Sequence, residues 1–149
     1  KMWALLLIIT ILTSSAEGYA IEGSWKVVDI LDTTLPEKYL IKAEIKNFIF
    51  RNTNIRWTLS FTGCQSFKYM MQVRDNNLYI DPSTLYIDNK GVQNCSEQSI
   101  RYENQLRRAI KKTFSFKMVY YLMAFSDPES NPVIKFERIV SNNTDRNKI

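Results

Sequence analysis

An alternating run at residues 55–73 constrains the fold of this 149-residue chain more than any other feature. Large apolar side chains recur at every second position on both sides of Gly63. They are Ile55, Trp57, Leu59 and Phe61 before the bend and Phe67, Tyr69, Met71 and Val73 after it. This period is typical of a strand with one buried face. Because Gly63 tolerates backbone angles that other residues avoid, the run predicts two antiparallel strands joined at residues 63–66.

The chain has two cysteines, Cys64 at this bend and Cys95 just before a helical pattern. In an oxidising compartment two cysteines most simply form one disulfide. We therefore predict a Cys64–Cys95 bridge that ties the bend to the helix. Two free buried thiols are the alternative.

Residues 1–20 have the layout of a secretory signal peptide. A basic start precedes a short apolar run, and small or polar residues follow at 13–16. We expect cleavage after Ala16 or after Ala20, which predicts a secreted, extracellular protein with no transmembrane span in its mature form. The apolar run is about nine residues, whereas a membrane-spanning helix needs roughly 20. An uncleaved membrane anchor is the less favoured alternative.

Two sequons are compatible with this secretory route. Asn94 and Asn142 each begin an Asn-x-Ser/Thr triplet and are candidate glycosylation sites. Asn94 adjoins a bridge cysteine and is the poorer candidate. Asn142 lies in the polar residues 141–149, whose composition predicts a disordered tail. Residues 21–140 remain as one domain.

The formal net charge of +5 is small for a chain of this length. Basic residues are scattered apart from Arg107, Arg108, Lys111 and Lys112, and no nucleic-acid-binding motif accompanies them. We expect no nucleic-acid partner. These four residues lie towards the end of the predicted helix, where cations complement the helix dipole, and anion binding is their alternative use.

The remaining pattern predicts a sheet and one helix. Strands are expected at residues 23–31, 47–51, 55–62, 67–73, 78–80, 116–125 and 133–140, with less regular structure at 81–94. In the first strand, Trp25, Val27, Asp29 and Leu31 should share a face. Ser96 is a candidate helix cap, and Leu106 and Ile110 follow it at helical spacing. An antiparallel sheet covered by a single helix is an α+β fold.

Several short motifs occur in a telling order. The motif Gly23-x-Trp25 opens the domain, and Gly63-Cys64 follows an alternating strand. Cys95 precedes Glu103-x-x-Leu106-x-x-x-Ile110, and Lys-Phe-Glu-Arg at 135–138 lies in the last expected strand. In this order, over residues 23–139, the motifs resemble the META domain, the family of the bacterial heat-shock-induced lipoprotein HslJ.

The resemblance implies a small, half-open antiparallel β-barrel of about six to eight strands with one helix packed on it. It also implies a role in outer-membrane or secretory stress, or in parasite virulence, without a defined biochemical activity. Secretin pilotins, whose fold is similar, bind lipid and a partner peptide.

The chain contains no histidine, which is the commonest general base and zinc ligand. Two carboxylate pairs, Asp29 with Asp32 and Glu97 with Glu103, have spacings that match no catalytic mechanism, so we expect them to be solvated charges. We therefore predict a protein that is not an enzyme and that has neither a metal nor a cofactor.

Trp25 opens the first predicted strand, and Arg138 lies near the end of the last. In lipocalins the Trp of a Gly-x-Trp motif closes the barrel floor beneath an Arg. Trp25 and Arg138 are therefore candidates for a barrel-closing pair through a cation–π contact. The favoured alternative is that Trp25 is simply a large core residue.

Trp57, Phe67 and Tyr69 are the candidate ligand-binding residues, because the chain is rich in methionines and aromatic residues that can line an adaptable cavity. Such side chains more often fill a core. The pairs Met70-Met71 and Tyr120-Tyr121 should each place one member on the outer face of a strand, which would leave apolar surface exposed.

These observations favour a secreted, monomeric, non-catalytic protein that binds the surface of an unknown protein partner. Carriage of a lipid or small apolar ligand is an alternative, and it requires an open cavity over Trp57, Phe67 and Tyr69. A protease inhibitor or host-directed effector is a third hypothesis, with residues 126–132 as the contact loop.

Overall fold

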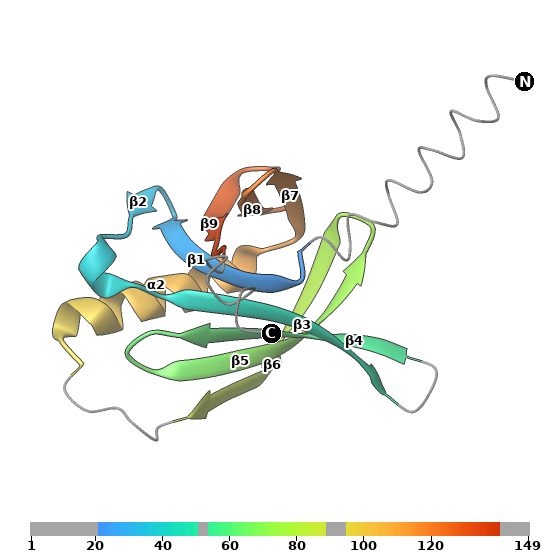
Figure 1. Cartoon of the computed structure of the whole chain (residues 1–149), viewed down its shortest axis with the longest axis horizontal. Helices are drawn as coiled ribbons and strands as arrows, with labels where there is room; N and C mark the ends of the chain where they lie inside the picture. Colours follow the sequence, from blue (N-terminus) through green and yellow to red (C-terminus); the bar gives the residue numbers. More distant parts are fainter. Residues whose placement is uncertain (1–20, 51–53, 89–94, 141–149) are drawn as a thin grey trace, which may run out of the picture.

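A computed structural model describes residues 21–50, 54–88 and 95–140, which form one antiparallel sheet and one α-helix (Figure 1). The strands are β1 (Gly23–Ile30), β2 (Thr33–Thr34), β3 (Lys42–Phe50), β4 (Asn54–Thr62), β5 (Ser66–Arg74), β6 (Asn77–Asp88), β7 (Ser115–Val119), β8 (Leu122–Ser126) and β9 (Pro132–Arg138). A 3-10 turn, η1 (Glu37–Tyr39), precedes β3, and the helix α2 (Glu97–Lys112) follows β6. The predicted α+β fold is confirmed, but the sheet has nine strands among the described residues, whereas the resemblance implied about six to eight.

Several expectations lie outside the described residues. They are the signal peptide at 1–20, both candidate glycosylation sites, Asn94 and Asn142, and the tail at 141–149. Within the described part of the chain, no helix is long and apolar enough to cross a membrane.

The sheet closes on itself. Neighbouring strands follow the order β2-β1-β3-β4-β5-β6-β7-β8-β9, and β1 also pairs with β9. The ring is thinnest between β6 and β7, where one residue pair, Asn77 and Ser115, faces across the strands. Backbone bonds from Leu78 to the Phe114 carbonyl, 2.8 Å, and from Phe116 to the Asn76 carbonyl, 2.9 Å, flank this seam. The helix α2 joins the same two strands along the chain and contacts β1, β6 and β9.

The hairpin predicted at residues 55–73 is confirmed as β4 and β5. Inward-facing residues lie opposite one another across the two strands, in the pairs Trp57–Met71, Leu59–Tyr69 and Phe61–Phe67. All six side chains are buried. The alternation therefore identified both strands and most of the face that makes the core. At the ends of the hairpin, Ile55 is 52% exposed and Val73 is only partly buried, so the predicted face does not extend over the whole run.

The face predicted for the first strand is only half right. Trp25 and Val27 point into the core, but the next buried residue is Ile30, whereas Asp29 and Leu31 are partly exposed. The pairing of β1 with β9 shifts register between Val27 and Asp29. A bulge of this kind adds one residue to one strand, so it moves the following side chains to the opposite face.

The structure extends two strands beyond their predicted bounds. A short strand was expected at residues 47–51, and its described part, 47–50, belongs to the longer β3 (Lys42–Phe50). Residues 78–88 form most of one continuous strand, β6, whose register against β5 shifts between Lys68 and Met70. The Thr84 hydroxyl maintains pairing there, because it accepts from the Met70 amide at 2.9 Å and donates to the Asp81 carbonyl at 2.6 Å.

The single strand predicted at 116–125 is wrong, because the chain folds back within it to form β7 and β8. Val119 pairs with Leu122, which leaves Tyr120 and Tyr121 as a two-residue turn. Tyr120 has a φ of 55°, a left-handed value that Gly or Asn usually supplies in such turns. The expectation that Tyr120 and Tyr121 lie on opposite strand faces is therefore also wrong.

The helix begins as predicted, with the Ser96 hydroxyl accepting from the Ser99 amide at 3.2 Å. Leu106, Ala109 and Ile110 are buried against the sheet. The expectation of a solvated Glu103 is wrong, because its side chain is 1% exposed. Its Oε1 atom accepts a 2.9 Å hydrogen bond from the Gln65 amide in the bend between β4 and β5.

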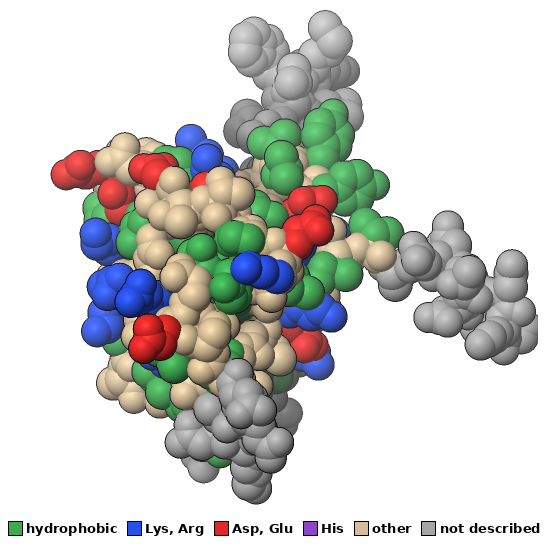
Figure 2. Space-filling model, turned by 90° about the vertical axis from the view of Figure 1, so that its left-hand side faces the viewer, with side chains coloured by type: hydrophobic (Ala, Val, Ile, Leu, Met, Phe, Trp, Pro, Cys, Tyr) green, Lys and Arg blue, Asp and Glu red, His purple; other side chains and the backbone are tan. Residues whose placement is uncertain are grey.

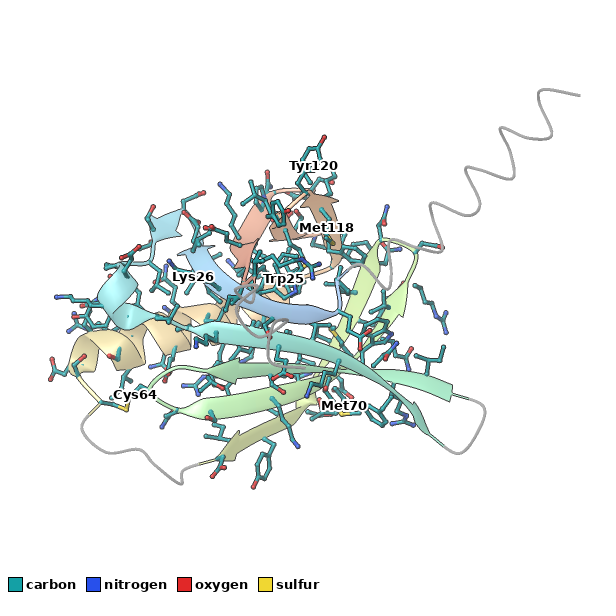
Figure 3. The ribbon with its side chains drawn as sticks, in the orientation of Figure 1. Trp25, Lys26, Cys64, Met70, Met118 and Tyr120 are labelled. Carbon is teal, nitrogen blue, oxygen red and sulfur yellow. A yellow bond between two sulfur atoms is a disulfide. The ribbon has the colours of Figure 1, made fainter. Side chains whose placement is uncertain are left out.

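The predicted disulfide is confirmed. It joins Cys64 and Cys95 with 5.7 Å between their Cα atoms, and Figure 3 shows Cys64 at the end of the sheet beside the start of α2. The bend of the central hairpin is thus attached to the helix both covalently and through Glu103.

Replacing both cysteines by alanine should lower the free energy of unfolding by about 3–4 kcal/mol, because the bridge closes a loop of 31 residues and restricts the unfolded chain. Urea denaturation of the oxidised wild type and of Cys64→Ala/Cys95→Ala measures the difference. Reduced wild-type protein is the matched control and should show the same loss. A difference below about 1 kcal/mol would contradict the stapling role.

Candidate functional site

The three residues predicted to bind a ligand lie together in the core. Trp57, Phe67 and Tyr69 are 5%, 2% and 2% exposed. Phe61 stacks on Phe67 with 5.1 Å between ring centroids, and Tyr69 meets Phe67 edge-on at 6.2 Å. These offset and edge-to-face contacts are the preferred packing of aromatic rings in a filled core.

Arg107 of α2 covers one side of this aromatic group. Its guanidinium lies 5.6 Å from the Phe67 ring centroid and donates to the Asn104 side chain. Burial raises the pKa of the Tyr69 hydroxyl, and the nearby positive charge of Arg107 partly opposes that increase. Of the four clustered basic residues, Lys111 and Lys112 lie in the last helical turn, where they suit the helix dipole, whereas Arg107 packs on the core.

Trp25 and Arg138 lie opposite each other on β1 and β9, the strands that close the ring. The Arg138 guanidinium lies 4.2 Å from the Trp25 ring centroid, and its Nη1 donates to the Glu22 carbonyl at 3.1 Å. Trp25 is fully buried, and its indole N–H donates to the Ile21 carbonyl at 2.8 Å. Trp25 is therefore a core residue that also carries a stacked arginine.

Six of the fourteen large apolar residues that are exposed in the described part of the chain lie in two short segments at one end of the molecule. We define the apolar tip as residues 119–122 with Ile139 and Val140. The exposed fractions are 63% for Val119, 89% for Tyr120, 61% for Tyr121, 56% for Leu122, 38% for Ile139 and 65% for Val140. The Arg138 amide donates to the Tyr121 carbonyl at 2.7 Å, which brings the end of β9 beside the turn.

The views in the figures agree with this grouping. Figure 2 shows hydrophobic side chains gathered at the upper right of the face that it presents, with acidic side chains beside them. Figure 3 shows Tyr120 projecting from the top of the molecule, with Trp25 among the strands below it. Glu137, which pairs with Leu122 across β8 and β9, is exposed and supplies a charge at the border of the tip.

A second apolar area on the outer face of the sheet is mixed with polar groups. Met70 is partly exposed while Met71 is buried, as predicted for neighbours on one strand. Met70, Tyr79 and Arg56 line a shallow pocket of about 350 Å³ together with Asp81. Hydrogen bonds from Ser83 lower the pKa of the Asp81 carboxyl, which favours the carboxylate, so this pocket has an anionic group and the Arg56 guanidinium on its walls.

The loop at residues 126–132 is a compact turn. The Asp127 carboxylate accepts from the Glu129 amide at 3.0 Å and from the Asn131 amide at 2.9 Å. Ser130 adopts a φ of 66°. Ser126 ends β8 and is buried, and Pro132 begins β9, so the predicted loop is reduced to a turn at residues 127–131 that the Asp127 side chain holds in a folded shape.

Among the described residues, no group of three or more histidine, cysteine, aspartate or glutamate side chains is arranged to hold a metal ion. Comparisons with protein-family models, with curated proteins and with solved structures found no match to this chain. The argument about function consequently depends on the geometry of the described residues.

Two features of these surfaces were missed at the level of sequence. The apolar tip was assigned to the middle of a strand, and the two adjacent tyrosines between β-rich segments were its available signal. The burial of Glu103 did have a local signal, because Glu103 precedes Leu106 by three residues and Ile110 by seven and so lies on the same helical face. Its partner Gln65, 38 residues earlier, had none.

Replacing Arg138 by methionine should lower the free energy of unfolding by about 1–2 kcal/mol, because the stacked guanidinium is lost from the Trp25 ring. Chemical denaturation measures the change. Lys135→Met, on an exposed position of the same strand, is the matched control and should change stability by less than about 0.5 kcal/mol. Equal effects of the two substitutions would contradict a specific contact.

The raised pKa of Tyr69 predicts a loss of stability at alkaline pH. The contribution of the neutral Tyr69 hydroxyl to the free energy of unfolding is fully present below the ordinary pKa of 10.0. It is lost as pH rises through the higher pKa of the folded state, because the unfolded chain ionises first. Tyr69→Phe should therefore lose stability less steeply than the wild type above this pH, while the exposed-site control Tyr120→Phe should follow the wild type. Urea denaturation at each pH measures the free energy of unfolding. If it falls with pH in parallel for Tyr69→Phe and wild type, Tyr69 is not the group with the raised pKa.

Proposed function

We propose that this chain is a secreted, META/HslJ-like protein that acts without catalysis, by binding the surface of a partner protein through its apolar tip. The observation that carries the proposal is the exposure of Tyr120 and Tyr121, 89% and 61%, at the centre of a continuous apolar group. The Cys64–Cys95 disulfide supports secretion, since such bonds persist in oxidising compartments. The thin seam between β6 and β7 supports the half-open barrel that the family resemblance implies.

The turn itself argues for function. Glycine or asparagine would occupy the left-handed position of Tyr120 at lower conformational cost, and a polar residue would avoid exposing apolar surface. A bulky aromatic residue that is both strained and solvent-exposed is unfavourable for folding and solubility. Its presence is explained if burial against a partner recovers the free energy.

The composition of the tip suits a protein surface. Tyrosine is enriched at the buried centre of protein interfaces, where one large side chain combines apolar area with a hydroxyl. Glu137 at the border provides part of a polar rim and would disfavour approach to an anionic lipid surface.

The two other functions considered have weaker support. A carrier needs space over Trp57, Phe67 and Tyr69, but these side chains are buried and pack against one another. An inhibitor that presents residues 126–132 to a protease needs an extended segment, but Asp127 folds this loop into a compact turn.

The test compares wild-type protein with Tyr120→Ser/Tyr121→Ser. Each is immobilised on beads and incubated with extracellular fluid from the organism that makes the protein. Captured proteins are quantified by mass spectrometry, and the affinity for the purified partner is then measured by calorimetry. The tip variant should weaken binding by at least about tenfold, the scale of an interface hot spot.

Tyr79→Ser/Tyr86→Ser is the matched control, because it removes two tyrosines that are 45% and 58% exposed on β6, away from the tip. It should bind as the wild type does. Equal losses in both variants, or none, would overturn the proposed contact. Tip-dependent sedimentation with lipid vesicles would overturn the choice of a protein partner, and a tip-dependent homodimer would overturn the monomeric state.

A further inference from the structure

A polar hollow of about 220 Å³ lies between the first half of α2 and the bend that follows β4. The residues that matter in its wall are Lys38, Tyr39, Gly63, Ser99, Tyr102 and Glu103. They come from η1, the bend and the helix, and the Cys64–Cys95 disulfide joins the bend to the residues just before the helix. The hollow is separate from the apolar tip, so an inference about it does not depend on the proposed function.

Glu103 is the unusual group in this wall. Its side chain is 1% exposed, and Oε1 is occupied by the Gln65 amide. The second oxygen, Oε2, is buried and has no hydrogen-bond partner among the residues that the structure describes. A buried carboxylate oxygen without a donor is costly, so this position favours a ligand that brings a donor and a positive charge.

The other walls suit the apolar part of such a ligand. The rings of Tyr39 and Tyr102 pack together with 5.2 Å between centroids and a tilt of 51°. The Lys38 ammonium lies 5.0 Å from the centroid of the Tyr39 ring, so this aromatic surface already attracts a cation. The Ser99 hydroxyl, bonded to that of Ser96 at 2.8 Å, adds a polar group at the helix start.

We propose that the hollow binds a small organic ammonium, with its N–H groups on the Glu103 carboxylate and its short alkyl chain against Tyr39 and Tyr102. A carboxylate beside aromatic rings combines a charge-assisted hydrogen bond with cation–π attraction. An anion would be repelled by Glu103. The volume restricts the ligand to a few carbon atoms, since sites for larger molecules occupy roughly 300 Å³ or more.

The test is a titration of the ¹⁵N-labelled disulfide-bonded protein with n-butylammonium, followed by amide shifts at Gly63 and Gln65. We expect saturable shifts at millimolar probe. The neutral isostere n-butanol should produce at least about tenfold weaker binding, because it lacks the charge. Unsaturated shifts at about 50 mM butylammonium, or equal affinity for butanol, would overturn the proposal.

Two variants and one control complete the test. Glu103→Gln keeps an acceptor for the Gln65 amide but removes the charge, so binding should weaken at least about tenfold. Ser99→Leu should abolish binding by filling the hollow, and it tests the site even if Glu103→Gln does not fold. Glu97→Gln, whose side chain is 93% exposed on the same helix, should bind as wild type. Unchanged binding in Ser99→Leu, or an equal loss of binding in Glu97→Gln, would overturn the site. The proposal would also be overturned if n-butylammonium bound only to Lys38→Met, because Lys38 would then exclude the ligand from the wild-type protein.

Discussion

The attachment of the Gly63–Gln65 bend to α2 is the constraint on which the rest of the structure depends. Three contacts make it: the Cys64–Cys95 disulfide, the hydrogen bond from Gln65 to Glu103, and the close approach of Gly63 to that carboxylate. A Cβ atom at Gly63 would lie 2.7 Å from Glu103 Oε1. Because Glu103 holds the bend and lies on the same helical face as Leu106 and Ile110, the bend also helps to set that buried face of α2 against the sheet.

This arrangement does not bury the apolar tip in the core. The interior is filled by the aromatic residues of β4 and β5 together with the buried face of the helix. Trp25 and Arg138 contact each other where β1 pairs with β9. The hairpin of β7 and β8 extends past this closure, and the described residues leave Tyr120 at its turn 89% exposed. A folded scaffold with an exposed aromatic turn is the feature on which the proposed binding role depends.

The sequence was informative where local pattern and tertiary packing agree. The period of two in β4 and β5, and the Ser96 cap of α2, were both sufficient to place an element and its buried face. The bulge after Val27 was missed because a one-residue insertion leaves no compositional sign. The turn at Tyr120 was missed because tyrosine favours strands. Glu103 was expected to be solvated because carboxylates are mostly exposed, although its spacing from Leu106 and Ile110 places it on the buried face of α2.

The most direct test of this account is amide hydrogen exchange at Gln65. A bend residue whose amide merely faces water exchanges within seconds to minutes, whereas one held by a buried carboxylate exchanges only when the structure opens. The account predicts that the Gln65 amide of the oxidised protein exchanges about as slowly as amides at the centre of β4. Rapid exchange at Gln65, with β4 still protected, would show that Glu103 does not hold the bend and would contradict the account.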